Sequence, residues 1–259
     1  MYDVNKLHIT TWGNGLVKIV LVHGGVQGTK KSGATHFSTQ ERLAKLGFSL
    51  LVPDRPGHGQ SPSPNRPDDA DADGQLIAEL LGDGAHLVGH SFGGCVALAA
   101  AAQRPAAVKS LTLIEPGMQA LAVNRFPVLL FVLRLLAILK LSFSPASRIK
   151  RFSKFMHIPH EVGGSALSKE ELVAMGNAVS VLKTPSKETL VGQLSIVKDD
   201  GIPLLVVTGG WSKGIDITGE MVARTGNGKH MIIPSPHHFP QLISDEFNEI
   251  FLQFINGLA

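Results

Sequence analysis

Ser91 lies between glycines at the point where an apolar run gives way to a pattern with helical spacing. It belongs to the segment 89–94 (GHSFGG), which follows the run 85–88 and precedes the small-residue run 95–100. A serine on a sharp turn between a strand and a helix adopts strained backbone dihedrals, and glycines two residues away leave room for the turn. The segment therefore predicts Ser91 as a nucleophile held above a sheet. A glycine-rich turn that only packs a helix on a strand is the alternative.

A serine hydroxyl is a poor nucleophile at neutral pH and needs an imidazole to accept its proton. Of the 11 histidines, His237 and His238 have the most suitable position. They follow the last predicted strand and precede the last predicted helix. One of these two side chains is therefore the expected general base.

A framework of short strands and helices must position these residues. Apolar runs rich in branched side chains alternate with segments of helical spacing, which is typical of βα units around a parallel sheet. We predict strands at Val17–Val22, Ser49–Pro53, His86–Gly89, Ser110–Glu115, Pro203–Thr208 and His230–Ile233, with an antiparallel edge strand near Leu7–Thr11. We predict helices at Ser38–Leu46, Asp71–Leu81, Phe92–Gln103, Thr218–Arg224 and Pro240–Ile255.

The alternation stops between the strand that ends at Glu115 and the one that begins at Pro203. A largely helical segment from Gly117 to Leu194 intervenes. We interpret residues 117–194 as a helical lid inserted into a core made of residues 1–116 and 195–259.

Four segments together resemble the α/β-hydrolase family. They are the GHSFGG segment around Ser91, the segment 23–25 (HGG) after the first buried run, the segment 54–61 (DRPGHGQS) after the next, and the segment 236–240 (PHHFP) after the last. The order matches that of the family, and the segments span nearly the whole chain apart from the lid. The resemblance implies an α/β fold with a mostly parallel central sheet flanked by helices.

The resemblance also implies roles for particular residues. The family pattern G-x-G-H-x-P aligns with residues 235–240 and places His238 in the position of the catalytic base. The backbone amides of Gly25 and Phe92 correspond to the oxyanion hole, where preorganised N–H groups stabilise developing charge. His23 and His58 are expected to hold loops in place rather than to react.

Two carboxylates could complete a catalytic triad. In most of the family the acid follows the strand here predicted at Pro203–Thr208, yet Ser212 or Lys213 occupies that position. Asp216 could still reach the histidine, although an aspartate before a helix is also a common N-cap. Some relatives, notably the haloalkane dehalogenases, carry the acid where Glu115 stands, and a glutamate there could instead brace the hinge into the lid. We favour Glu115, with Asp216 as the alternative.

Residues 126–139 of the lid form a run that is apolar nearly all round, interrupted by Arg134. Such a helix would have to be covered on more than one side. Its side chains could line a substrate pocket or simply pack against the core. Four basic residues follow and could favour an anionic surface, a carboxylate-bearing substrate or simply solvent, namely Arg148, Lys150, Arg151 and Lys154.

Composition limits the possible partners and compartment. The formal charge of +3 is too small to imply nucleic-acid binding, and 44% hydrophobic residues suit a globular core. The single cysteine, Cys95, excludes an internal disulfide and a cysteine-rich metal site. The longest apolar run is shorter than the roughly 20 residues of a membrane span. With no visible signal peptide, we expect a cytoplasmic protein without a transmembrane segment.

These features predict a cofactor-free, metal-independent serine hydrolase that cleaves an ester or lactone bond of a small apolar substrate through an acyl-enzyme. The serine argues against relatives with an aspartate nucleophile, and the only tyrosine, Tyr2, lies outside the lid. A carbon–carbon bond hydrolase, a perhydrolase and a hydrolase-like small-molecule binding or signalling protein remain alternatives. We expect a monomer or homodimer.

Overall fold

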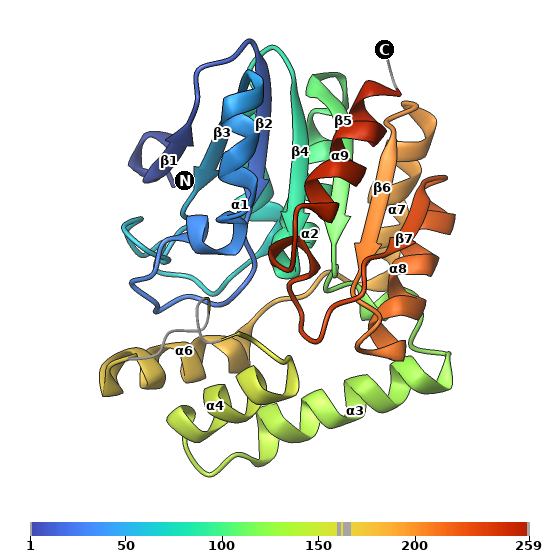
Figure 1. The fold of residues 1–259 in the computed structure, drawn as a ribbon. Helices are drawn as coiled ribbons and strands as arrows, with labels where there is room; N and C mark the ends of the chain where they lie inside the picture. The colour runs from blue at the N-terminus through green and yellow to red at the C-terminus, as the bar shows by residue number, and fades with distance from the viewer. Residues whose placement is uncertain (1, 160–161, 163–166, 258–259) are drawn as a thin grey trace.

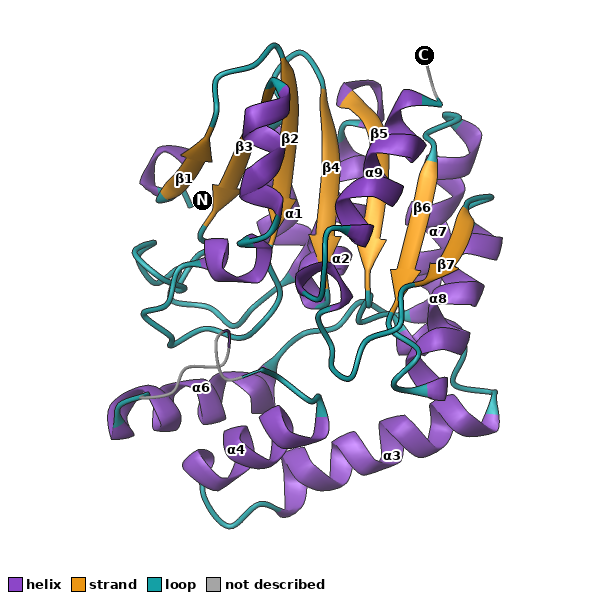
Figure 2. Ribbon diagram, viewed as in Figure 1, coloured by secondary structure: helices purple, strands orange, loops and turns teal. Residues whose placement is uncertain are grey.

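One sheet with the strand order β1-β3-β2-β4-β5-β6-β7 forms the centre of the computed structural model (Figures 1 and 2). The structure describes residues 2–159, 162 and 167–257. The strands are β1 (Ile9–Trp12), β2 (Val17–Val22), β3 (Phe48–Pro53), β4 (Ala85–His90), β5 (Val108–Ile114), β6 (Leu204–Thr208) and β7 (Lys229–Ile232). Only β1 pairs antiparallel, with β3, and the other pairs are parallel. The carboxyl ends of the parallel strands therefore meet at one edge.

Alternate residues of the central strands enter two separate apolar clusters, one on each face of the sheet. In β6, Leu204 and Val206 belong to the first cluster, while Leu205 and Val207 belong to the second. The first cluster also contains residues of α1 (Ala70–Leu80), α2 (Phe92–Gln103), α7 (Lys187–Asp199) and α8 (Lys213–Thr225). The second contains residues of α9 (Glu246–Asn256) and of the 3-10 turns η2 (Gly33–Phe37) and η3 (Gln40–Leu46). Strands covered on both faces explain the continuous apolar runs of the sequence.

Three further helices lie below the carboxyl ends of the strands, in the lower part of Figures 1 and 2. They are α3 (Phe126–Leu141), α4 (Pro145–Phe155) and α6 (Lys169–Val181). All three come from the segment between β5 and β6, and we call them the inserted helices. The expected boundary after Leu194 falls inside α7, whose residues Leu190, Leu194 and Val197 are buried in the first core cluster. We therefore propose that the insertion ends before α7.

Two predicted helices differ in form from the structure. The segment predicted as a helix at Ser38–Leu46 is wound mostly as the 3-10 turn η3, and the one predicted at Pro240–Ile255 is divided into η6 (Pro240–Leu242) and α9. The division has a specific cause. The carbonyl oxygen of Gln241 accepts hydrogen bonds from Thr39 Oγ1 at 2.6 Å and Gln40 Nε2 at 2.9 Å, so it is not used to continue a helix.

Helix α8 begins at Lys213, five residues before the predicted start at Thr218. The early start was not predicted because Gly214 lies in this segment and glycine is unfavourable inside helices. Here tertiary packing outweighs that preference, since a Cβ on Gly214 would lie 2.9 Å from Cβ of Phe131 in α3. The glycine allows the two helices to approach closely.

Helix α3 is buried on one side only, contrary to the expectation that it would be covered on several. Val128 and Phe131 are buried, whereas Leu133 is 53% exposed. At 16 residues α3 is also short for a bilayer. None of the described helices is long and apolar enough to span a membrane.

Candidate active site

Ser91 occupies a strained turn between β4 and α2. Its φ of 56° and ψ of −124° lie in a region that side chains other than glycine rarely adopt. The turn is fixed by two backbone hydrogen bonds, from Ser91 N to Ile114 O at 2.8 Å and from Gly94 N to Ser91 O at 2.9 Å. A Cβ on Gly93 would lie 2.3 Å from the carbonyl oxygen of Val22. The glycine spacing in the sequence thus has the steric cause inferred for it.

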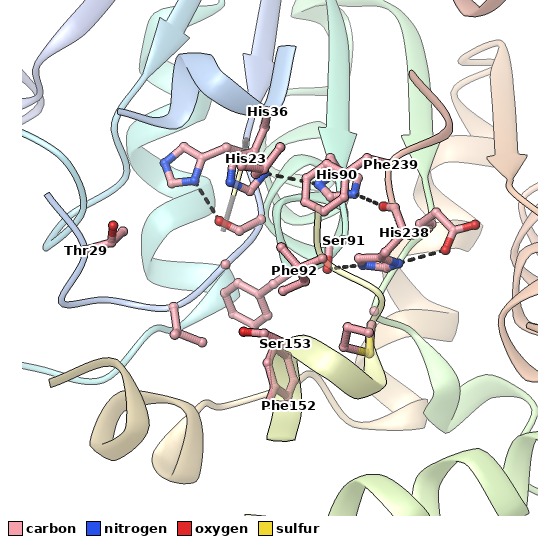
Figure 3. A pocket seen from close by; sticks show the side chains of 18 of the residues that line it. His23, Thr29, His36, His90, Ser91, Phe92, Phe152, Ser153, His238 and Phe239 are labelled. Carbon is pink, nitrogen blue, oxygen red and sulfur yellow. Dashed lines mark hydrogen bonds and ion pairs between the residues drawn. The ribbon is translucent and has the colours of Figure 1, made fainter. Parts of the chain in front are cut away.

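The hydroxyl of Ser91 faces the imidazole of His238 (Figure 3). Oγ of Ser91 lies 2.9 Å from Nε2 of His238, and Nδ1 of His238 lies 2.8 Å from Oε2 of Glu115. His238 is 3% exposed and Glu115 is fully buried. The structure therefore brings together a hydroxyl, an imidazole and a carboxylate in one line of hydrogen bonds.

The Glu115 carboxylate accepts two further hydrogen bonds at the end of β5. The backbone N–H of Gly209 donates to Oε1 at 2.5 Å, and the indole Nε1 of Trp211 donates to Oε2 at 2.7 Å. Glu115 itself has a φ of 49°, an uncommon value for a glutamate. A buried carboxylate requires such partners, and the loop after β6 supplies both of them.

Asp216, the alternative acid, has a different environment. It lies in the first turn of α8, and its Oδ1 accepts a hydrogen bond from Gly210 N at 3.2 Å. No hydrogen bond or ion pair joins it to His238 in the part of the chain that the structure describes. Because α8 begins early, the side chain of Asp216 bonds to the preceding loop.

The loop 23–25 passes directly beside Ser91. A Cβ on Gly24 would lie 2.7 Å from Cβ of Ser91, and Gly25 has a φ of 85°. Within the described residues, the amide of Gly25 donates no backbone hydrogen bond. The amide of Phe92 is the first of α2, and the first amides of a helix have no acceptor within it. Both amides are available to an anion.

His23 ties this loop to the turn that follows β3. Its Nδ1 donates to the carbonyl oxygen of Gly24 at 2.7 Å, and its Nε2 accepts from Arg55 N at 2.9 Å. Burial lowers the pKa of His23 well below its ordinary value, and the neighbouring His58 and Arg55 lower it further. The ring is therefore neutral, with its proton on Nδ1, and it links the loop 23–25 to the turn after β3.

Sequence reasoning missed the buried ion cluster around Arg55. Its guanidinium lies 2.8 Å from Asp68 and 2.9 Å from Asp73, and all three side chains are nearly inaccessible to water. Arg55 also donates to the carbonyl oxygen of Gly25 at 3.2 Å. The cluster thus anchors the loop beside Ser91. No spacing rule pairs residues that a tertiary turn brings together, so nothing in the sequence indicated it.

His90 is a second residue that the sequence did not single out. Its Nε2 donates to the backbone carbonyl oxygen of His238 at 2.7 Å, and His36 lies on its other side, with the two Nδ1 atoms 3.4 Å apart. Burial, together with His238 and His36, lowers the pKa of His90 well below its ordinary value. A neutral His90 therefore fixes the backbone of the loop that carries His238.

A cavity of about 1190 Å³, including its open mouth, extends from Ser91 beneath the inserted helices. Its wall on that side is apolar and includes Phe131, Leu135, Ile149, Phe152, Met156 and Met175. The opposite wall is more polar and includes Thr29, Ser32, Thr35 and His36. Figure 3 shows Phe152 and Ser153 below Ser91 and His36 above it. The hydroxyl thus lies between an apolar wall and a polar one.

Among the described residues, no group of three or more histidine, cysteine or carboxylate side chains is arranged to hold a metal ion. Cys95 is buried in α2, and burial raises its pKa to about 12. Its side chain is therefore a thiol at neutral pH, and it packs as a small apolar group.

Comparison with known proteins agrees with this architecture. Residues 19–250 match the model of the alpha/beta hydrolase family. A 118-residue segment is 36% identical to Lipase LipV of Mycobacterium tuberculosis, covering 43% of this chain and 42% of that protein. A 136-residue segment is 37% identical to the pimeloyl-[acyl-carrier protein] methyl ester esterase of Methylococcus capsulatus, covering 46% of this chain and 49% of that protein. These matches span less than half the length of each relative.

Solved structures share the fold over almost the entire chain. MenH from S. aureus superposes with a TM-score of 0.68 at 20% sequence identity, covering 97% of this chain and 98% of its own. Est816, described as an N-acyl homoserine lactone degrading enzyme, superposes with a TM-score of 0.63 at 19% identity, covering 96% of both chains. At such identities the likeness concerns the fold alone.

Proposed function

The chain belongs to the α/β-hydrolase family, and we propose that it is a serine hydrolase that cleaves an ester or lactone bond of a small, largely apolar substrate. One observation carries the proposal. Ser91, His238 and Glu115 are joined by hydrogen bonds of 2.9 and 2.8 Å beside two available backbone amides. This arrangement has the parts that acyl transfer to a serine requires.

In the first step Oγ of Ser91 attacks the carbonyl carbon of the substrate while Nε2 of His238 accepts its proton. The Glu115 carboxylate holds Nδ1 of the imidazole and stabilises the imidazolium that forms. The carbonyl π electrons move to the carbonyl oxygen, which becomes a tetrahedral oxyanion. The amides of Gly25 and Phe92 are the proposed donors to that oxygen, and they need no reorganisation as charge develops.

The intermediate then collapses to an ester on Ser91. The bond to the leaving alcohol breaks, and the imidazolium of His238 returns the proton to the alcohol oxygen. A water molecule deprotonated by the same imidazole attacks the acyl carbon, and the free acid leaves as the serine is reprotonated. Every step uses side chains and backbone of this chain, so the proposed reaction needs no cofactor.

The cavity and the relatives support an apolar carboxylic ester or lactone. The wall supplied by the inserted helices, including Phe131, Ile149 and Phe152, suits an acyl chain. We propose that these helices act as a lid over the reacting group. The named relatives include a lipase, a methyl ester esterase and a lactone-degrading enzyme. One of these names specifies a methyl ester and another an N-acyl homoserine lactone.

Carbon–carbon bond hydrolysis is the second candidate. A 118-residue segment is 30% identical to a 2-hydroxy-6-oxononadienedioate/2-hydroxy-6-oxononatrienedioate hydrolase of Cupriavidus pinatubonensis. The more polar wall near Thr29 and His36 could face a second polar group of such a substrate. Ester substrates without that group separate the two candidates.

The test is the release of p-nitrophenol from acetyl to dodecanoyl esters by the wild type, Ser91→Ala and Ser153→Ala. Ser153 is the matched control, because it is a serine that lines the same cavity without a bond to His238. We expect a burst followed by turnover in the wild type and in Ser153→Ala, and neither in Ser91→Ala. Wild-type protein that gives no burst and no turnover with any ester would refute ester hydrolysis and favour the second candidate.

A further inference from the structure

Helix α3 carries an apolar face that no described part of the chain covers. Of the seventeen large apolar side chains that are exposed among the described residues, seven lie between residues 126 and 143. They are Phe126, Leu129, Leu130, Leu133, Leu136, Leu141 and Phe143, with exposed fractions from 37% to 101%. A monomeric protein in water rarely leaves so many neighbouring apolar side chains exposed.

Five of these side chains form one stripe along the helix. Phe126, Leu129, Leu130, Leu133 and Leu136 are separated by three or four residues, which is the spacing of one helical face. The buried residues of α3, Val128 and Phe131, lie on the opposite side. A helix of 16 residues is about 24 Å long, so the stripe is long enough to lie along a surface.

The same region is strongly basic. Residues 116–159 contain no aspartate or glutamate. They contain seven basic residues, namely Arg125, Arg134, Lys140, Arg148, Lys150, Arg151 and Lys154. Because the whole chain has a formal charge of only +3, the remainder of the molecule is net negative. The positive charge is thus concentrated beside the apolar stripe.

Several of these cations meet in an open groove between α3, α4 and the start of α8. The groove has a volume of about 1380 Å³ including the open solvent at its mouth, and Arg134, Arg151, Lys154 and Lys213 line it together with apolar side chains such as Leu130. No carboxylate is among its described lining residues. Both α3 and α4 lie at the lower edge of Figures 1 and 2, on the side away from the sheet. Stripe and groove therefore share one side of the molecule, which we call the cap face.

We propose that the cap face seats the protein on an anionic lipid surface, with α3 lying in the plane of the interface. The stripe would enter the acyl boundary, and the groove cations would meet the phosphate groups just above it. A second copy of the chain would instead place like charges opposite one another. An acidic protein partner would pair with the cations of the groove, but the leucine stripe would then need a separate apolar partner. This inference goes beyond the proposed hydrolysis. It is tested independently of it, because lipid binding is measured without turnover.

One side chain connects the cap face to the interior. Phe131 lines both the groove and the cavity that contains Ser91, and it packs against Phe155 with ring centroids 5.0 Å apart. An amphiphile held in the groove would therefore lie one layer of side chains from the cavity. The arrangement suits a protein that draws its ligand from a lipid surface.

The test is flotation of the full chain with vesicles of ether-linked lipids, which contain no ester that could be hydrolysed. One set consists of phosphatidylcholine, and the other contains phosphatidylglycerol as a quarter of the lipid. We expect binding to the anionic set at low salt and a loss of that binding as the salt concentration rises, because screening weakens attraction between exposed charges. This arm uses the wild type alone, so it does not depend on how variants fold.

Two variants with matched controls locate the binding surface. Leu133→Ser with Leu136→Ser removes part of the stripe, and Leu16→Ser with Leu46→Ser is its control because both leucines are more than 60% exposed elsewhere. The charge variant combines Arg134→Gln, Arg151→Gln and Lys154→Gln, and its control combines Lys45→Gln, Lys187→Gln and Lys229→Gln. Each basic residue near an anionic lipid surface contributes about fivefold to partitioning, so the charge variant should bind roughly 100-fold more weakly.

The proposal fails if the wild type does not bind anionic vesicles at low salt, or if each control loses as much binding as its cap-face counterpart. Sedimentation velocity provides a further test. A wild-type dimer that Leu133→Ser dissociates would assign the stripe to a second copy of the chain and overturn the lipid assignment. A monomer that floats only with anionic vesicles supports it.

Discussion

The indole of Trp211 donates a 2.7 Å hydrogen bond to Oε2 of Glu115, the same oxygen that lies 2.8 Å from Nδ1 of His238. Trp211 itself packs against His157, with ring centroids 5.0 Å apart. One carboxylate oxygen thus receives a donor from the loop after β6 and another from the imidazole. The indole donor restrains this oxygen, so we propose Trp211 as a positioning residue for the proposed triad.

Trp211→Phe should lower kcat about tenfold and leave KM almost unchanged. A hydrogen bond to a charged group contributes about 1.5–3 kcal/mol, and losing roughly half of that from an oriented carboxylate corresponds to about a tenfold change in rate. Trp12→Phe is the matched control, because Trp12 lies on the edge strand β1 and is the only other tryptophan. Steady-state kinetics with a p-nitrophenyl ester measure both variants. Equal rates for Trp211→Phe and the wild type would remove the positioning role.

Glu115→Gln should reduce kcat by about 10³-fold, because an amide can stabilise the wrong imidazole tautomer and cannot stabilise the imidazolium. Asp216→Asn should change kcat by less than about threefold, since Asp216 bonds to Gly210 and not to His238. Kinetics of the two variants at one pH decide between the carboxylates. A large loss in Asp216→Asn with near-normal Glu115→Gln would reverse the assignment.

Gly93→Ala should lower the free energy of unfolding by more than about 3 kcal/mol, the range of severe overpacking. The added Cβ would lie 2.3 and 2.4 Å from the carbonyl oxygens of Val22 and His23, and backbone atoms there cannot move cheaply. Gly192→Ala is the control. Apart from its own helix backbone and chain neighbours, nothing lies within 4 Å of its added Cβ, so in helix α7 it should raise stability by about 0.5–1 kcal/mol. Urea unfolding measures both, and equal effects would contradict the steric argument.

Much of the fold was predictable because its central strands are buried on both faces. Apolar runs such as the one at Val17–Val22 are typical of such strands, and the predicted strands all overlap observed ones. The position of Ser91 was predictable for a related reason. Its turn requires glycines at fixed spacing, and steric requirements of that kind appear directly in the sequence.

Other features depend on contacts between distant segments and could not be predicted. The start of α8 was missed because Gly214 looks unfavourable for a helix until its packing on Phe131 is known. The Arg55 cluster and the bond from His90 to the backbone of His238 join residues that have no characteristic spacing. Likewise, the apolar run at residues 126–139 indicated a helix but could not show which of its faces stays exposed.

Phe152→Ala should shift the preferred acyl chain toward longer esters. Phe152 lines the cavity from α4 and packs against two small groups of buried apolar residues, one around Ile149 and the other around Phe131, so its removal enlarges the apolar end of the cavity. Phe143→Ala is the control, because Phe143 lies in the same insertion but is fully exposed. The measurement is kcat/KM across a series of p-nitrophenyl esters. An unchanged preference in Phe152→Ala would separate this wall of the cavity from acyl recognition.

The buried histidines around the site should make the protein less stable in mild acid. His23, His58 and His90 are at most 2% exposed, and burial is the main cause that lowers the pKa of each well below its ordinary value of about 6.5. Below pH 6.5 the unfolded chain therefore binds protons that the folded protein excludes. The free energy of unfolding should be nearly constant from pH 8 to 7 and should fall below pH 6.5 by about 1.4 kcal/mol per pH unit for each such histidine. Urea unfolding at a series of pH values measures this slope. His90→Gln retains a donor for the carbonyl oxygen of His238, so the slope should become shallower by the contribution of one histidine. An identical slope would show that His90 is already protonated in the folded protein.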